Sequence, residues 1–304
     1  YFSMGSAARG AVVCLHGLGE RLSESALSSC ARFLLDAETE VLAYLPAKTS
    51  AGAAAAASLV HMVLGSRASN VSIHAEPETP EEVEHIMQPL HDSTYGQRLL
   101  WLTTQAKETE NDEHAEVLQS TALLALDSIR SALFQSHALS WCLERLRLRE
   151  MERGVAFSTV AVARADLQWF ASLPLFPIQF GDVFVPDGYE WQGVNDIFAL
   201  VTRSSAESYL DAEVQVQQFG FNYLDWLVIW TEEQSVGHKT AGRIPPGAEM
   251  FLKLRLTLSG FNVLRFAPMF ARRCEEEQPG TGIWRGSRYH RYHHKRAGIA
   301  DAGQ

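Results

Sequence analysis

The sequence lacks any run of about 18 apolar residues, the length that a membrane-spanning helix needs. Its alanine-rich stretch at residues 53–57 is far shorter. Cysteine is scarce, and the four cysteines do not occur at the spacing of zinc ligands: Cys14, Cys30, Cys142 and Cys274. We therefore expect neither a membrane span nor a structural zinc site. One or two disulfides would suit a secreted protein, but the sequence assigns no pairing.

Excess positive charge is also absent, since the net charge is −10. This argues against a nucleic-acid partner, which would require a basic surface. The 304 residues, 46% of them apolar and 20% charged, suit one large globular domain or two small ones. We expect a single domain over residues 5–277 and a basic, His- and Arg-rich tail over 278–304. Residues 1–4 resemble the remnant of a cleaved expression tag.

The sequence also lacks a motif that α/β hydrolases require. Residues 12–19 (Val-Val-Cys-Leu-His-Gly-Leu-Gly) look like the strand and oxyanion loop of an α/β hydrolase. That fold requires a Gly-x-Ser-x-Gly turn to expose its nucleophile, and the sequence contains no such pentapeptide. An oxyanion loop without a nucleophile has no reaction to serve, so an esterase is only the third interpretation.

What is present is an alternation of short apolar runs with amphipathic segments, which predicts an α/β fold. We expect a mostly parallel central sheet with helices on both faces. Ser23 is expected to cap a first helix, and Thr79 with Pro80 to open another. Strands are predicted at residues 11–15, 40–45, 71–74, 155–163, 197–201 and 261–266, and helices at 113–151 (with one possible break), 205–219 and 247–259. Residues 173–194 and 232–247 are predicted to form irregular loops.

Two strand ends carry candidate ligand-binding residues. After the first strand, Gly17 leaves room for a ligand to approach the backbone, and Arg21 could meet a diphosphate. The strand before Arg164 delivers Arg164 and Asp166 to its carboxyl end, where open α/β sheets bind ligands. Asp166 could hold a metal ion that stabilises a departing diphosphate. The alternative is a structural pair between Arg164 and Asp166.

Two further segments carry candidate catalytic residues. In the run Gly193-Val194-Asn195-Asp196, Asn195 could contact the cofactor, and Asp196 could orient sugar hydroxyls or act as a base. The alternative is an Asx turn before a strand. Glu249 could also accept a proton, or could instead stabilise the N-terminus of the helix that it opens.

These segments, in this order, resemble a diverse set of nucleotide-sugar-dependent glycosyltransferases of GT-A-like fold. That family has an Arg-x-Arg-Pro-Asp-Leu segment, matched here by residues 162–167 without the first arginine and the proline. A Gly-hydrophobic-Asn-Asp-Arg-Phe-Ala segment follows in the family, matched by residues 193–199 with Ile197 in place of the arginine. A late helix led by glutamate is matched from Glu249. The resemblance extends over most of the chain, from residue 11 to about 273.

The resemblance implies a Rossmann-related domain that moves a hexosyl or pentosyl group from a UDP- or GDP-sugar to a hydroxyl acceptor. It implies catalytic roles for Asp196 and Glu249. It also implies donor binding by Gly17, Arg21, Arg164, Asp166 and Asn195, and a Mn²⁺ or Mg²⁺ ion at Asp166. The acceptor would be a glycan or glycoprotein. The protein would work in the Golgi lumen if eukaryotic, with an N-terminal anchor removed, or otherwise in the cytoplasm.

A second interpretation is a catalytically inactive domain of the same fold that acts as a binding or scaffold module. The arginines missing from the two motifs favour it. The tryptophans include candidates for stacking on sugar rings, although packing in the core is the commoner role of this residue: Trp169, Trp191, Trp226, Trp230 and Trp284.

Overall fold

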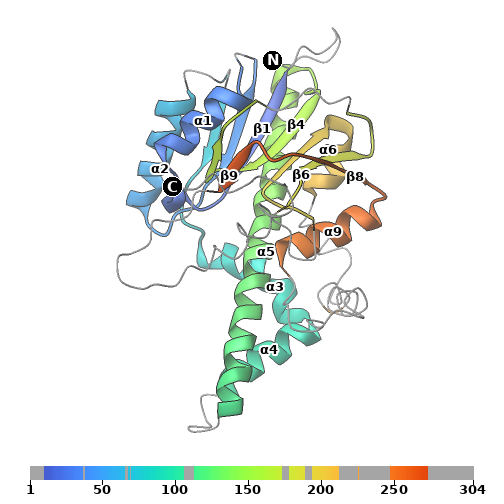
Figure 1. Ribbon diagram of the computed structural model, residues 1–304. Coiled ribbons are helices and arrows are strands. Elements are labelled where there is room, and N and C mark those ends of the chain that lie inside the picture. Colours follow the sequence, from blue (N-terminus) through green and yellow to red (C-terminus); the bar gives the residue numbers. More distant parts are fainter. Residues whose placement is uncertain are drawn as a thin grey trace, which may run out of the picture.

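The computed structural model describes the greater part of the chain (Figure 1). The described residues are 10–36, 38–65, 68, 70–105, 113–172, 178–188, 194–211, 225 and 247–272. The predicted loop at 232–247, except for Gly247, the tail at 278–304, and Trp191, Trp226 and Trp230 lie outside these residues. Within them, no helix is both long and apolar enough to cross a membrane.

A seven-stranded sheet forms the centre of the molecule, with strand order β3-β2-β1-β4-β7-β6-β8. Its strands are β1 (Ala11–His16), β2 (Glu40–Tyr44), β3 (Asn70–His74), β4 (Thr159–Arg164), β6 (Asp182–Pro186), β7 (Phe198–Thr202) and β8 (Asn262–Phe266). Six strands run in one direction, and β7 runs antiparallel to its neighbours β4 and β6. The predicted mostly parallel α/β sheet is therefore confirmed.

The strand order reverses between β1 and β4. From β1 the chain adds β2 and then β3 on one side, and β4 then pairs with the other side of β1. At such a switch point the connections leave the two strand ends in opposite directions, which opens a crevice where α/β proteins bind ligands.

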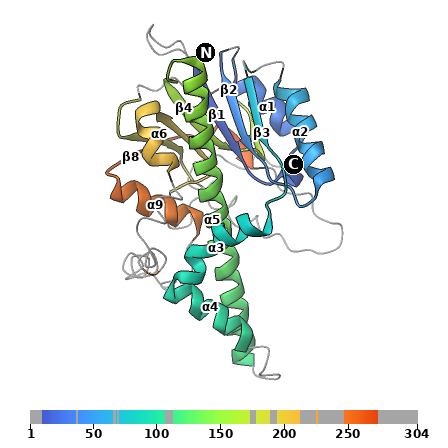
Figure 2. The same ribbon diagram turned by 180° about the vertical axis from the view of Figure 1, so that it is seen from behind.

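Helices cover both faces of the sheet, as predicted. α1 (Glu24–Leu34) and α2 (Ser50–Leu64) pack on one face, and α5 (Glu113–Arg153), α6 (Arg203–Leu210) and α9 (Ala248–Leu258) on the other (Figures 1 and 2). Alternate residues of β1 therefore enter two different cores: Val13 and Leu15 face α1, whereas Val12 and Cys14 face α5. This alternation fixes the face on which each strand-end residue lies.

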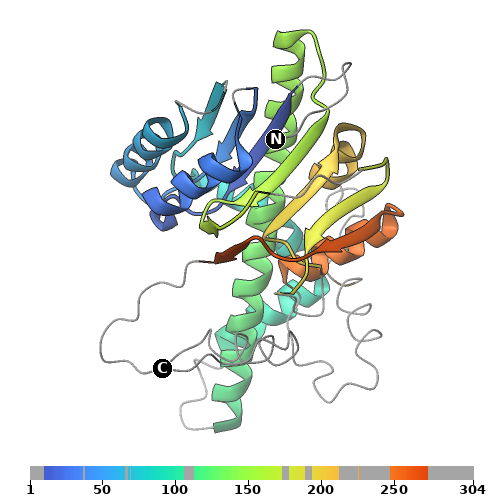
Figure 3. The same ribbon diagram turned by 45° about the horizontal axis from the view of Figure 1, so that its top comes forward.

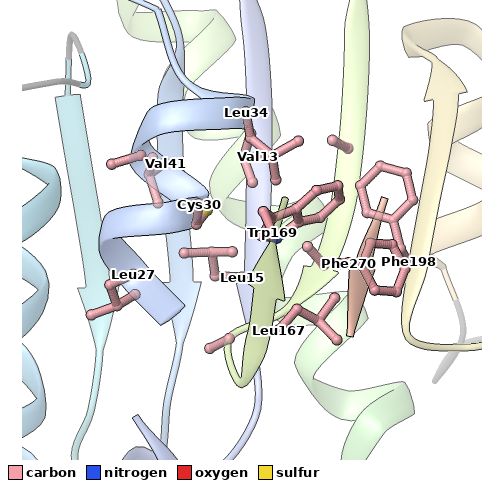
Figure 4. Close-up of a cluster of buried hydrophobic side chains, with 14 of the residues drawn as sticks. Val13, Leu15, Leu27, Cys30, Leu34, Val41, Leu167, Trp169, Phe198 and Phe270 are labelled. Atoms are coloured by element: carbon pink, nitrogen blue, oxygen red, sulfur yellow. The ribbon is translucent and has the colours of Figure 1, made fainter. Parts of the chain in front are cut away.

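The core on the α1 side continues into a small second sheet of β5 (Leu167–Trp169) and β9 (Phe270–Arg272). Trp169 is 2% exposed and packs against Phe198 and Phe270, with ring centroids 5.2 and 4.7 Å away (Figure 4). Trp169 thus has a packing role, and it anchors the chain directly after Asp166.

The predicted helix starts are confirmed where the capping residues are described. The Ser23 hydroxyl accepts a hydrogen bond from the Ala26 amide. Thr79 and Glu82 form a capping box at the start of α3 (Pro80–Asp92), each side chain accepting from the other residue's backbone N–H. Local hydrogen bonds of this kind depend on few residues, which is why the sequence predicts them well.

The possible break in the long helix is not present. α5 is continuous over 41 residues, about 60 Å at 1.5 Å per residue. It runs past the sheet and packs, beyond it, against α3 and α4 (Thr94–Gln105) (Figure 3). A disulfide between Cys14 of β1 and Cys142 of α5, with a Cα–Cα distance of 6.1 Å, joins the helix to the sheet.

Two predictions of secondary structure need correction. The segment predicted as irregular at 173–194 contains β6, whose five residues are all buried. Of the Gly and Pro residues in this segment, Gly181 directly precedes the strand and Pro186 ends it. The helix predicted from Ser205 begins at Arg203, capped by Thr202, and ends at Leu210.

Candidate functional site

The carboxyl ends of β1 and β4 meet at the switch point. His16 and Arg164 are the last residues of these strands and are partners in the register. The Ala165 amide donates to the carbonyl of His16 over 2.9 Å, and the Gly17 amide donates to the carbonyl of Tyr44 over 3.2 Å. Gly17 has φ of 143°, in a region that side chains other than glycine rarely adopt. The predicted tight turn after the first strand is present.

Arg164 and Asp166 form a two-point ion pair at this switch point. The Arg164 Nε and Nη2 atoms donate to the two Asp166 carboxylate oxygens over 3.0 and 2.6 Å. The two side chains are 20% and 11% exposed. Burial opposes the charge on Arg164, but the hydrogen bonds and charge of Asp166, with the charge of Asp196, outweigh it and raise the pKa of Arg164. Arg164 is therefore a permanent cation at the edge of the sheet.

The pairing bears on the predicted metal ion at Asp166. Both oxygens of this carboxylate already accept hydrogen bonds from Arg164. Among the described residues, no three His, Cys, Asp or Glu side chains are grouped so that they could hold a metal. Mg²⁺ sites often use one or two carboxylates together with substrate phosphates, so the predicted ion at Asp166 stays a prediction. The alternative of a structural Arg–Asp pair fits the geometry.

His16 is a site residue that the sequence prediction missed. Its side chain lies on the α5 face, like that of Cys14 two residues earlier, and is only 5% exposed. Its Nε2 atom has no hydrogen-bond partner within the described part of the chain. Burial, and then the charge of Arg164, lower its pKa to about 4, while Asp166 acts in the opposite direction. A buried polar atom without a partner costs about 1–3 kcal/mol, so a neutral imidazole in this position calls for an explanation.

The sequence contained a signal for His16, namely a polar residue that ends a wholly apolar strand. The His-Gly-Leu-Gly run predicts a tight turn, with an oxyanion loop as the alternative that the missing nucleophile disfavours. The structure gives this loop a different role, because the Gly17 and Gly19 amides donate to the carbonyls of Tyr44 and Pro46. Neither N–H is available to an oxyanion. A Cβ at position 19 would lie 3.0 Å from the Leu45 carbonyl, so Gly19 serves close packing.

Asn195 and Asp196 reach the same edge because β7 runs in the opposite direction to β4. The Arg164 amide donates to the carbonyl of Ile197 over 3.0 Å. Asn195 is fully buried: its Nδ2 donates to the Gly188 carbonyl over 2.6 Å, and its Oδ1 accepts from the Ile197 amide over 3.0 Å. This is the Asx turn of the alternative interpretation. Asn195 therefore shapes the loop, and its predicted cofactor contact stays a prediction.

Asp196 is half-buried, and its charge acts on both Arg164 and Tyr209. The backbone carbonyl of Asp196 accepts a hydrogen bond from Gln135 Nε2 of α5 over 3.2 Å. Asp196 is thus held beside the Arg164–Asp166 pair by two different elements, β7 and α5.

The other two predicted residues are less closely associated with this pair. Glu249 lies in the first turn of α9, and its backbone carbonyl accepts from the Val194 amide over 3.0 Å, which connects α9 to the segment before Asn195. Arg21 is exposed at the end of the short helix η1 (Gly19–Arg21), on the loop that follows Gly17. The structure therefore brings Gly17, Arg164, Asp166 and Asp196 together, and places Glu249 and Arg21 on adjoining segments.

The last residues of four parallel strands form one row across this edge. The register pairs His74 with Tyr44, Tyr44 with His16, and His16 with Arg164. The His74 ring stacks on Tyr44, with centroids 4.7 Å apart and an interplanar angle of 4°. Trp141 of α5 packs against both of these rings. His74 Nε2 also lacks a partner among the described residues, so the row contains two imidazoles whose Nε2 atoms are unsatisfied.

Comparison with known proteins adds no relative, since the chain matches no protein-family model and no curated protein. The geometry of this edge is therefore the basis for inferring a function.

Proposed function

We propose that the protein binds a nucleotide sugar at the carboxyl ends of β1 and β4 and transfers the sugar to a hydroxyl acceptor. The observation that carries the proposal is a buried cation, Arg164, held by Asp166 at the switch point of an open α/β sheet. In such folds the crevice at this point is where phosphorylated ligands bind. A glycan or glycoprotein is the acceptor class that we propose.

Each residue of the site has a task in this reaction. Departure of a nucleoside diphosphate develops negative charge, and a fixed guanidinium can stabilise that charge without reorganising. Gly17 adds no side chain at the crevice. The acceptor hydroxyl must lose its proton to a base, and Asp196, held beside Arg164, is the better-placed of the two candidate carboxylates; Glu249 is the other. No step is assigned to a metal.

The second candidate function, a binding module without catalysis, also has a specific observation in its favour. Asp166 is engaged by Arg164 through both oxygens, and Asn195 is engaged by backbone groups through both ends of its amide. Two of the predicted donor-binding side chains are thus occupied by structural bonds. A domain that binds a nucleotide sugar without turning it over would keep this arrangement.

The test is a thermal-shift screen of UDP-, GDP- and CMP-sugars, followed by an assay of donor hydrolysis and of sugar transfer to a glycan acceptor. A ligand that binds the folded state raises its melting temperature by mass action. We expect one nucleotide class to stabilise the wild type and not Arg164→Gln, and turnover to be lost in Asp196→Asn. Stabilisation without turnover would support the binding module. No stabilisation by any nucleotide sugar would contradict both functions.

The disulfide bears on where the protein works. Buried disulfides form in oxidising compartments and are rare in the cytosol. The Cys14–Cys142 bond therefore supports a proposal that the chain folds in a secretory or extracellular environment.

A further inference from the structure

We propose that this site binds the diphosphate of its ligand without a divalent cation, using the Arg164 guanidinium and the His16 Nε2 atom in place of a metal. This inference rests on the proposed nucleotide-sugar site and specifies how that site recognises phosphate.

Asp166 fixes the orientation of the Arg164 side chain. A guanidinium has five N–H donors, and Asp166 accepts from two of the nitrogens, Nε and Nη2. Asp166 therefore fixes one edge of the planar group, and the other N–H groups point away from that carboxylate. The Arg164 side chain is one-fifth exposed. A guanidinium held in this way can bind phosphate oxygens with its outer edge.

His16 lies beside Arg164 in the sheet. It is the register partner of Arg164, on the adjacent strand and at the same edge, and strands in a sheet are about 4.8 Å apart. Buried polar atoms in native proteins nearly always have a partner, yet Nε2 of His16 has none among the described residues. A neutral imidazole with its proton on Nε2 can donate to a phosphate oxygen, which would satisfy this atom when ligand is bound.

Substitution of Asp196 distinguishes binding without a metal from binding through a metal. This carboxylate acts on Arg164, and in a site without metal it repels an anionic ligand. Neutralising it as Asp196→Asn should therefore tighten anion binding. In a site that requires a divalent cation, the same substitution would remove a carboxylate near the metal and weaken binding. The two mechanisms thus predict effects of opposite sign.

The experiment is a calorimetric titration of the whole protein with inorganic pyrophosphate and with UDP, in EDTA and in Mn²⁺. We expect affinities that agree within about twofold between the two conditions. We expect His16→Leu to weaken binding by about tenfold, the loss of one good hydrogen bond, and Asp196→Asn to strengthen it. His61→Leu is the control, because it makes the same substitution at an exposed position of α2, outside the row, and should leave binding unchanged.

His16→Leu should not destabilise the fold, since it replaces an unsatisfied buried polar group by an apolar one, and an unchanged or higher melting temperature would confirm this. Binding that requires Mn²⁺, or that weakens in Asp196→Asn, would overturn the inference and leave the proposed function standing. Pyrophosphate binding in EDTA with no binding of nucleotide sugars would support the inference and contradict the function. No binding of either probe in either condition would contradict both.

Discussion

Arginine–carboxylate pairs lie at both ends of the strands of the central sheet. They occur where the parallel strands begin, which we call the amino edge, and where these strands end, the carboxyl edge. At the amino edge, Glu40 of β2 accepts from Arg149 of α5, and Glu150 accepts from Arg203 through both oxygens over 2.7 Å each. Glu150 also accepts from the Phe157 amide over 2.9 Å. At the carboxyl edge, one pair stands beside two imidazoles with unsatisfied Nε2 atoms.

This difference separates structure from function. At the amino edge these carboxylates bind arginines of α5 and α6, and the pairs fasten the C-terminal end of α5 to the sheet and to α6. At the carboxyl edge, the Nε2 atom of His16 has no partner among the described residues, and the fold alone does not explain it. In this protein, a buried polar atom without a hydrogen-bond partner therefore indicates a candidate site better than a charged side chain does.

The largest expected effect lies at the amino edge. Glu150→Ala removes the acceptor of three hydrogen bonds, one of them from the Phe157 amide. It leaves Arg203, in a largely buried position, with Glu207 as its remaining carboxylate partner. We expect a loss of about 4 kcal/mol of unfolding free energy in denaturant titrations, with no change in nucleotide binding. A loss below about 1 kcal/mol would show that the amino-edge pairs do not fasten α5, and the comparison would fail. Glu144→Ala, at an exposed position of the same helix, serves as a surface control.

The next effect concerns pH and the carboxyl edge. The folded protein keeps His16 neutral down to a pKa of about 4, whereas the unfolded chain protonates it near 6.5. Between these values the unfolded state binds more protons, so stability is complete above about pH 6.5 and falls as the pH decreases toward 4. The shift corresponds to about 3 kcal/mol. Unfolding measured from pH 7 to 4 should show this decrease in the wild type and a smaller one in His16→Leu; equal slopes would contradict it.

Opening the disulfide is expected to affect both stability and the site. Cys14→Ala with Cys142→Ala opens the link between β1 and α5, and typical native disulfides contribute about 2 to 4 kcal/mol. Because Cys14 precedes His16 by two residues, the double variant should also weaken pyrophosphate binding relative to the wild type. Substitution of the buried free thiol, Cys30→Ala, is the control on the other face of the sheet. If both variants bind equally well, the link does not position the site.

Much of the fold could be predicted because its signals are local. The apolar run before His16 and the capping residues Ser23 and Thr79 each depend on a few neighbouring residues. The strand β6 was missed because a five-residue buried strand ending in proline has no period of its own. The pairing of Cys14 with Cys142 depends on how α5 crosses β1, which no local pattern records.

The candidate site was predicted in part for the same reason. Arg164 and Asp166 follow a recognisable strand, and their mutual bonding was one of the two interpretations that the sequence allowed. That His16 lies beside them depends on β1 pairing with β4, across 148 residues of chain, and the lack of a partner for its Nε2 atom exists only in three dimensions. The assignment of a reaction to these residues stays a proposal that the experiments above decide.

The reversed strand β7 has a consequence for how such a site can change over time. Because β6 and β7 are antiparallel, β6 ends and β7 begins at the same edge of the sheet, the one at which β1 and β4 end. Insertions or substitutions in the connection between β6 and β7 can reshape the rim of the crevice while every ladder bond of the sheet is retained. Variants of this chain with new ligand preferences should therefore accumulate their differences in this one connection, and leave the strands that carry His16 and Arg164 as they are.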